Sequence, residues 1–204
     1  MRRLLGTILA VCLAVPVAAG PMEQIIERRQ AAARSLAKVA DCTVAKQPDV
    51  TAEWLLIRDP RATWPSKLNK AISACLSGDL NSSFMKAQNS VWRGILGMGF
   101  VRHPEHIPAG LVAPPLPVPA TADFDIVTSV AACVIATDAV GARSFVDAIA
   151  GLPEEKASFD VIAPAATRCV QPWPDVEINA PMMRAGLGFA LFRKAVADAA
   201  AGSQ

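Results

Sequence analysis

The side chains best suited to metal binding lie in one short segment, His103-Pro104-Glu105-His106, which contains both histidines of the chain. Two imidazoles and a carboxylate can bind Zn²⁺, whose sites need three or four protein ligands. The proline breaks helical spacing between the imidazoles, and the proline-rich stretch that follows offers no obvious fourth ligand. The sequence therefore predicts solvated loop histidines at this segment and no metal site.

The sequence offers few groups for catalysis. Nucleophilic catalysis needs a base beside the nucleophile, but no G-x-S-x-G motif, P-loop or dinucleotide fingerprint occurs. Four carboxylates could act as general acids or bases after burial, but they lie where helices or turns are expected to begin, as acidic residues often do; they are Asp123, Asp125, Glu154 and Glu155. We expect a protein that is not an enzyme and needs no cofactor; a cryptic enzyme is the alternative.

Arg93 and Arg184 are the candidate ligand-binding residues. Each is followed nine residues later by a second arginine, Arg102 or Arg193. Nine residues are two and a half helical turns, so we expect one arginine of each pair to face the other half of the chain and one to face solvent. Because guanidinium binds carboxylates bidentately, Arg93 and Arg184 could anchor a small molecule or peptide in a groove between the halves. The alternative is a structural ion pair or a charge at a helix C-terminus.

The chain has five cysteines. Cys12 lies within residues 1–19, an expected signal peptide, and the other four are Cys42, Cys75, Cys133 and Cys169. An even number in an exported protein indicates disulfides, and four cysteines allow three pairings. Intervals of 33 and 36 positions separate the first two and the last two, and the first cysteine of each pair is 91 positions from the other. This regularity predicts Cys42–Cys75 and Cys133–Cys169, one disulfide in each half.

Four blocks of similar sequence occur twice in the same order, about 91 residues apart. Self-similarity at a fixed interval indicates a duplicated structural unit. The matched blocks are Val39-Ala-Asp-Cys42-Thr-Val with Val130-Ala-Ala-Cys133-Val-Ile, Val50 to Leu56 with Val140 to Val146, Ala71 to Leu76 with Ala165 to Val170, and Arg93 to Arg102 with Arg184 to Arg193.

These blocks resemble uncharacterised exported proteobacterial proteins with a duplicated Cys-pair helical unit. In that family a Cys-Val-type helix end, a short helix, a Cys-Leu-type helix end and a final helix with an Arg-Gly/Ala-x-Leu core follow one another. The resemblance covers both halves, from about Ala33 to Lys194. The relatives often have Ala-Glu in the final helix, where this chain has Gly97-Met98 and Gly188-Phe189 and so lacks that carboxylate. The resemblance implies a helical fold and export, and it implies no activity.

Residues 1–19 have the layout of a secretory signal peptide. A basic start precedes an apolar run from Leu4 to Val15, and small residues lead to an expected cleavage after Ala19. No later apolar run reaches about 20 residues, so we expect no stable membrane span after signal removal. Loss of Arg2 and Arg3 leaves 18 basic and 18 acidic residues, and a neutral chain has little attraction for nucleic acid. The expected location is periplasmic or secreted.

The remaining sequence predicts an all-α fold of two pseudo-repeats with about four helices each. The expected helices are 22–45, 49–57, 64–76 and 81–101 in the first half, and 121–137, 140–150, 154–169 and 180–200 in the second. Asp49, Asn179 and a residue of Asn81-Ser82-Ser83 are expected N-caps, and Pro164 is expected to split the seventh helix into two.

The predicted organisation is a first helical repeat at 20–102, a linker at 103–120 and a second helical repeat at 121–204. Six prolines between positions 104 and 119 favour extended geometry, which predicts a stiff connector lying over the surface. Together, these patterns favour an exported helical protein that acts through binding or as a structural component, with partner and ligand unknown.

Overall fold

The computed structural model describes residues 21–57, 59, 62–76, 89–115, 123–148 and 152–201. Within these ranges the regular structure is helical, with no strand, which confirms the all-α prediction. The helices are α1 (Pro21–Lys46), α2 (Pro48–Leu56), α3 (Ser66–Cys75), α4 (Asn89–Arg102), the 3₁₀ turn η2 (Pro104–His106), α5 (Asp123–Thr137), α6 (Ala139–Asp147), α7 (Pro153–Val170) and α8 (Ala180–Ala201).

The ends of the helices follow the local capping chemistry, with one correction. Asn179 caps α8 as predicted, since its side-chain oxygen accepts a hydrogen bond of 3.0 Å from the Met182 N–H. The prediction that Asp49 is an N-cap is wrong, because α2 begins one residue earlier with Gln47 at the N-cap and Pro48 in the first turn. Proline is well suited to that first position, and Asp49 then lies in the first turn, where the helix dipole favours acidic residues.

The predicted break at Pro164 is also wrong, because α7 runs through this proline without interruption. Pro164 is exposed, so the helix carbonyl that lacks a partner there can be hydrated. Ile162, Ala165 and Cys169 are buried on the other side of the helix and hold it against the core. Burial on one face therefore keeps the helix continuous.

Some sequence-based predictions lie outside the described residues. They are the signal peptide at 1–19, the N-cap within Asn81-Ser82-Ser83, and the part of the linker from position 116 onward.

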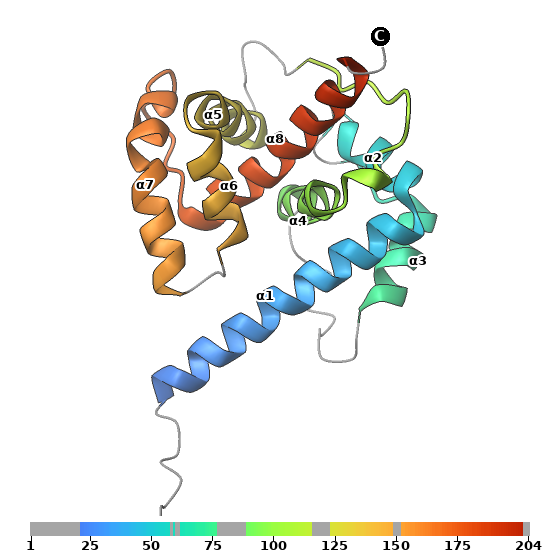
Figure 1. Ribbon diagram of the computed structural model, residues 1–204, viewed down its shortest axis with the longest axis horizontal. Helices are drawn as coiled ribbons and strands as arrows, with labels where there is room; N and C mark the ends of the chain where they lie inside the picture. Colours follow the sequence, from blue (N-terminus) through green and yellow to red (C-terminus); the bar gives the residue numbers. More distant parts are fainter. Residues whose placement is uncertain are drawn as a thin grey trace, which may run out of the picture.

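The helices form two groups that meet at α4 and α8. These two helices cross at the centre of the molecule and make its most extensive helix–helix contact (Figure 1). Helices α1 and α2 pack on α4, and α3 packs on α1. Helices α5 and α6 pack on α8, and α7 packs on α5. Each half of the chain thus packs around its own final helix.

Glycines at the crossing of α4 and α8 let the two backbones approach closely. A Cβ on Gly97 would lie 2.7 Å from the Gly188 carbonyl oxygen, and a Cβ on Gly94 would lie 2.4 Å from the Ala185 Cα. Gly97 and Gly188 therefore allow the two helices to approach closely. Both pairs join positions 91 residues apart, so the same part of each final helix contacts its counterpart.

Two hydrophobic clusters fill the interior, and each receives a side chain from the other half. Met98 of α4 packs in the cluster formed mainly by α5 to α8. Phe189 of α8 packs in the cluster formed mainly by α1 to α4, together with Phe192, whose ring stacks on Phe100 at 5.0 Å between centroids. The halves are therefore joined by a shared apolar interface, whose burial is the main favourable term in such packing.

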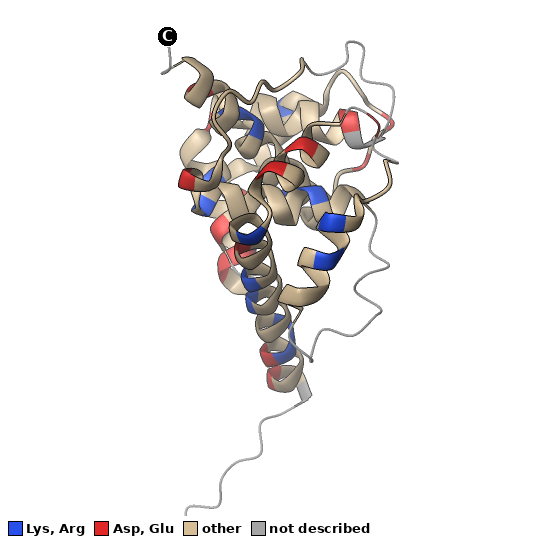
Figure 2. Ribbon diagram, turned by 90° about the vertical axis from the view of Figure 1, so that its right-hand side faces the viewer, with Lys and Arg blue, Asp and Glu red and all other residues tan. Residues whose placement is uncertain are grey.

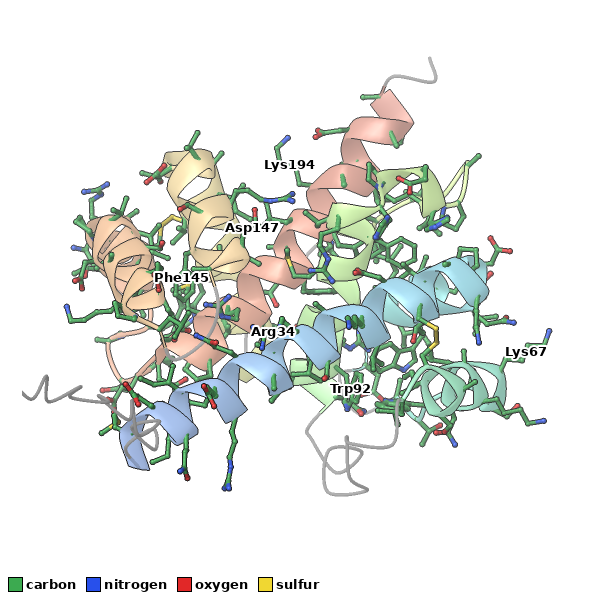
Figure 3. All side chains as sticks on the ribbon, turned by 60° about the horizontal axis from the view of Figure 1, so that its bottom comes forward. Arg34, Lys67, Trp92, Phe145, Asp147 and Lys194 are labelled. Carbon is green, nitrogen blue, oxygen red and sulfur yellow. A yellow bond between two sulfur atoms is a disulfide. The ribbon has the colours of Figure 1, made fainter. Side chains whose placement is uncertain are left out.

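The predicted disulfide pairing is confirmed. Cys42–Cys75 joins α1 to α3, and Cys133–Cys169 joins α5 to α7, each with Cα atoms 5.8 Å apart (Figure 3). Disulfides persist in oxidising environments, so their presence is typical of a compartment outside the cytoplasm.

The N-terminal part of α1 extends beyond the other helices, with acidic residues near its tip and basic residues further along it (Figure 2). No single helix among the described residues has the length and hydropathy for a membrane span; α5 and α6 reach it only as a pair bent by 120°.

Candidate functional site

A groove of about 380 Å³ lies between α5 and α8 and is closed on one side by residues 113–115 of the proline-rich segment. We call it the α5–α8 groove. Its volume is in the lower part of the range typical of small-molecule sites. The lining residues are Ala113, Pro114, Pro115, Thr128, Ala132, Ile135, Ala136, Ala190, Arg193, Lys194 and Ala197.

The α5–α8 groove combines an apolar lining with two basic side chains. Alanine, proline and isoleucine make up most of the lining, so a bound molecule would meet mainly hydrocarbon. The Arg193 guanidinium donates a hydrogen bond to the Pro114 carbonyl and lies 5.6 Å from the centroid of the Phe189 ring. Lys194 extends outward from α8 and pairs with the exposed Asp198 at 2.8 Å (Figure 3). Exposed pairs of this kind contribute little energy and exchange readily with other anions.

The proline-rich segment positions one wall of the groove. Leu111 and Ala113 pack against the first hydrophobic cluster, and the hydrogen bond between Arg193 and Pro114 fixes the segment across α8. The described part of the predicted connector therefore packs against the helices and forms one wall of the groove.

Asp125 lies in the first turn of α5, near the cationic groups of both final helices. Burial raises the pKa of its carboxyl, and the positive charges of Arg93 and Arg193 act in the opposite direction without cancelling the effect. The Asp125 carboxylate is therefore a partly buried negative charge near one arginine of α4 and one arginine of α8.

Arg93 is buried where the two halves meet; it donates hydrogen bonds to backbone carbonyls of the first half, and its guanidinium lies 5.8 Å from the centroid of the Phe189 ring of α8. Its side chain is only 1% exposed. The guanidinium donates hydrogen bonds to the carbonyls of Leu55, Ile57 and Asp59 at 2.6, 2.9 and 3.0 Å, and lies 4.8 Å from the centroid of the Trp54 ring. Burial lowers the Arg93 pKa to about 10, although the charges of Asp59 and Asp125 oppose that change.

Arg184 makes similar contacts within the second half, with a carboxylate in place of the third carbonyl. Its guanidinium donates to the carbonyls of Val146 and Ala148, both at 2.7 Å, and to the Glu155 carboxylate at 2.9 Å. It lies 4.8 Å from the centroid of the Phe145 ring. Arg93 and Arg184 thus hold the end of a short helix in their own halves, and neither lines the α5–α8 groove.

The second arginine of each final helix lies nearer the surface. Arg102 donates to the Asp41 carboxylate from Nε at 2.9 Å and from Nη2 at 2.7 Å. Arg193 lines the α5–α8 groove. The two arginines of each final helix therefore have different surroundings. The hydrogen bonds described for Arg93, Arg102 and Arg184 go to residues of their own half, whereas the spacing predicts that one arginine of each pair faces the other half.

The structure brings the histidine segment together on the turn η2. Donor atoms of His103, Glu105 and His106 lie within 4.8 Å of one another, and the Glu105 carboxylate lies 3.2 Å from His103 Nδ1. His103 Nε2 is also 3.7 Å from the Asp41 carboxylate. A hydrogen bond with the backbone and the neighbouring imidazoles lower the Glu105 pKa. The imidazoles therefore form part of a polar cluster with Asp41 and Arg102.

The candidate catalytic carboxylates have separate surroundings. Glu155 pairs with Arg184, Glu154 is exposed in the first turn of α7, and Asp125 lies on α5 near Arg93 and Arg193. The Asp123 side chain lies outside the described part of the chain. Asp125 thus lies on α5, whereas Glu154 and Glu155 lie on α7, and the three carboxylates have different surroundings.

Comparison with known proteins gives no relative from which a function could be transferred. No protein-family model matches the chain, and no curated protein and no solved structure matches it significantly. The chemical properties of the α5–α8 groove are therefore the basis for a functional interpretation.

Proposed function

We propose that this protein is an exported, non-enzymatic helical binding protein, periplasmic or secreted, and that the α5–α8 groove is its ligand site. Support for export comes from the signal-peptide pattern at 1–19 and from the two disulfides. The observation that carries the binding proposal is the groove itself, in which an apolar lining meets Arg193 and Lys194. Ligand sites typically have this composition of hydrophobic walls with a few placed polar groups.

We further propose that the chain arose by duplication of a four-helix unit. Helices α2 and α6 have nine residues each and begin 91 positions apart, as α4 and α8 do. The hydrogen bonds of Arg93 to residues 55 and 57 correspond, after the same shift, to those of Arg184 to residues 146 and 148. The contact of Gly97 with Gly188 supports a twofold relation between the copies, because symmetric interfaces join like positions.

The binding proposal can be tested with 1-anilinonaphthalene-8-sulfonate, a fluorescent apolar anion. We expect saturable fluorescence enhancement with the disulfide-bonded protein in its folded state. Ala136 is an exposed residue of the groove wall, so Ala136→Trp should fill the groove without disturbing the core and weaken dye binding by about tenfold. Val140→Trp, at an exposed position of α6 outside the groove, is the matched control and should bind normally. Equal dye binding by both variants, or none by the unmodified protein, would refute the proposal.

A further inference from the structure

We propose that the α5–α8 groove binds a small molecule with a carboxylate on an apolar chain, and that this carboxylate occupies the place that Asp41 occupies in the first half. The inference rests on the proposed groove function and on the proposed duplication, and it adds the chemical class of the ligand. Its basis is a comparison of the two halves at corresponding positions.

The first half contains a built-in carboxylate on the surface between α1 and α4. The Asp41 carboxylate accepts two hydrogen bonds from Arg102, at 2.9 and 2.7 Å. His103 Nε2 lies 3.7 Å from the same oxygen, Oδ1. Arg102 also donates to the Ala37 carbonyl at 3.3 Å, which fixes the guanidinium against α1. This surface therefore has the side chains that hold a carboxylate, and the carboxylate is supplied by the chain.

Residues 91 positions later in the sequence line the α5–α8 groove. Arg102 becomes Arg193 and His103 becomes Lys194, so two cationic or protonatable groups are kept. The lining residues Thr128, Ala132, Ile135, Ala136 and Ala190 correspond in sequence to Ala37, Asp41, Val44, Ala45 and Gly99 of α1 and α4. Ala197 has no such counterpart, because α4 ends at Arg102 while α8 continues to Ala201.

The decisive difference is at position 132, where alanine replaces the counterpart of Asp41. Ala132 lines the groove and carries no carboxylate, so the contact that Asp41 makes with Arg102 has no counterpart at this position. Arg193 lies near Asp125 instead, and Lys194 pairs with the exposed Asp198. The proline-rich segment then covers the outer side of the space, with the Pro114 carbonyl on Arg193. A ligand carboxylate at this position would meet a guanidinium fork and an ammonium group, which together favour a planar anion.

The remainder of the groove determines the rest of the ligand. Ile135, Ala136 and Ala197 line it beyond position 132 with hydrocarbon. These walls favour an apolar chain or ring attached to the carboxylate, because burial of apolar surface is then gained without loss of polar hydration.

The test uses octanoate and 1-octanol, which share an apolar chain and differ in the head group. Calorimetric titration of the disulfide-bonded protein at neutral pH is expected to show at least about tenfold tighter binding of octanoate, the difference that one charge-assisted contact supplies. Octanoate binding that is no tighter than octanol binding would overturn the carboxylate inference. If both compounds displace the dye equally well, the groove is still a binding site and only the carboxylate inference is wrong. If the unmodified protein does not bind the dye, the proposed groove function itself is refuted.

Variants at position 132 give an independent readout. Ala132→Asp restores the first-half arrangement, and we expect it to weaken octanoate binding by about tenfold while the thermal midpoint stays at or above that of the unmodified protein. Ala132→Asn has nearly the same size without the charge, and we expect it to retain most of the octanoate affinity. Unchanged octanoate binding by a folded Ala132→Asp protein, or an equal loss with both variants, would overturn the inference. A melting curve for each variant separates loss of the site from loss of the fold.

Discussion

At the scale of single residues, Arg93 and Arg184 show how a charged side chain can complete a helix end. The last carbonyls of a helix lack partners within the helix. Each guanidinium reaches across to such carbonyls at the end of α2 or α6 and stacks on an aromatic ring of the same helix. The sequence could identify these residues by type and spacing, but their acceptors are backbone atoms, which leave no mark in the sequence.

Replacement of Arg93 by methionine tests this role. Arg93→Met keeps the aliphatic stem but leaves three carbonyls without their donor, so we expect a loss of about 3–5 kcal/mol in the free energy of unfolding. Arg184→Met should have a comparable effect, because it also leaves Glu155 without its cation. Lys156→Met removes an exposed helical pair with Asp160 and should change stability by no more than about 0.5 kcal/mol. Urea unfolding measures all three, and a small effect of Arg93→Met would contradict the role assigned here.

Asp125 gives a prediction about pH. Its pKa in the folded protein is raised by burial, so ionisation costs stability as the pH rises above the unfolded-state value of about 3.9. Asp125→Asn should therefore raise the thermal midpoint at pH 7, and the gain should disappear as the pH falls below about 4. Asp49→Asn removes an exposed first-turn carboxylate and should bring no gain at either pH. A gain for Asp125→Asn that is the same at pH 3.5 and pH 7 would refute this explanation.

At the scale of helices, most elements could be predicted from caps, breakers and apolar spacing. The error at Pro164 arose because tertiary burial of Ile162, Ala165 and Cys169 outweighs the local cost of a proline. The α5–α8 groove could not be predicted, since its walls are mainly alanine, isoleucine and proline, which have no distinctive pattern. The alignment of the two halves does contain one indication of the groove. Asp41 aligns with Ala132, although the nine-residue spacing of the arginines in the final helix is the same in both halves.

The close contact between α4 and α8 depends on glycines, which have no Cβ, where the two helices cross. Gly97→Ala places a Cβ against the Gly188 backbone carbonyl, where neither helix can yield easily, so we expect a loss of about 2–3 kcal/mol. Gly110→Ala is a useful comparison, because nothing lies within 4 Å of its Cβ and only the positive φ of 75° opposes it. That variant should cost about 1 kcal/mol. If chemical denaturation shows Gly97→Ala to be no worse than Gly110→Ala, the helices do not approach as closely as described.

At the scale of the whole molecule, each half has its own covalent link. Replacement of Cys42 and Cys75 by serine, or of Cys133 and Cys169, opens a loop of 33 or 36 residues. The chain-entropy relation predicts a loss of about 4 kcal/mol for each pair. The two losses should be similar because the loops are similar, and guanidinium unfolding of the two double variants measures them. Peptide mapping that joins a cysteine of one half to a cysteine of the other would contradict the pairing.

The duplication proposed above accounts for the features that the two halves share, and the surface beside the second arginine is one place where the halves differ. Shared features hold the fold: the arginine-bound helix ends, the disulfides and the close contact of the final helices. In the first half, the surface beside the second arginine is filled by Asp41 and the histidine segment. In the second half, the corresponding surface is the α5–α8 groove. Under the proposed duplication and the proposed groove function, divergence of one copy would convert a structural ion pair into a ligand site.

The most direct test of this account is an experimental structure of the disulfide-bonded protein with octanoate bound. The account predicts that the octanoate carboxylate lies within hydrogen-bonding distance of Arg193, next to Ala132, with its hydrocarbon chain along Ile135 and Ala197. Octanoate bound elsewhere, or in the groove with its carboxylate turned away from Arg193 and Lys194, would contradict it.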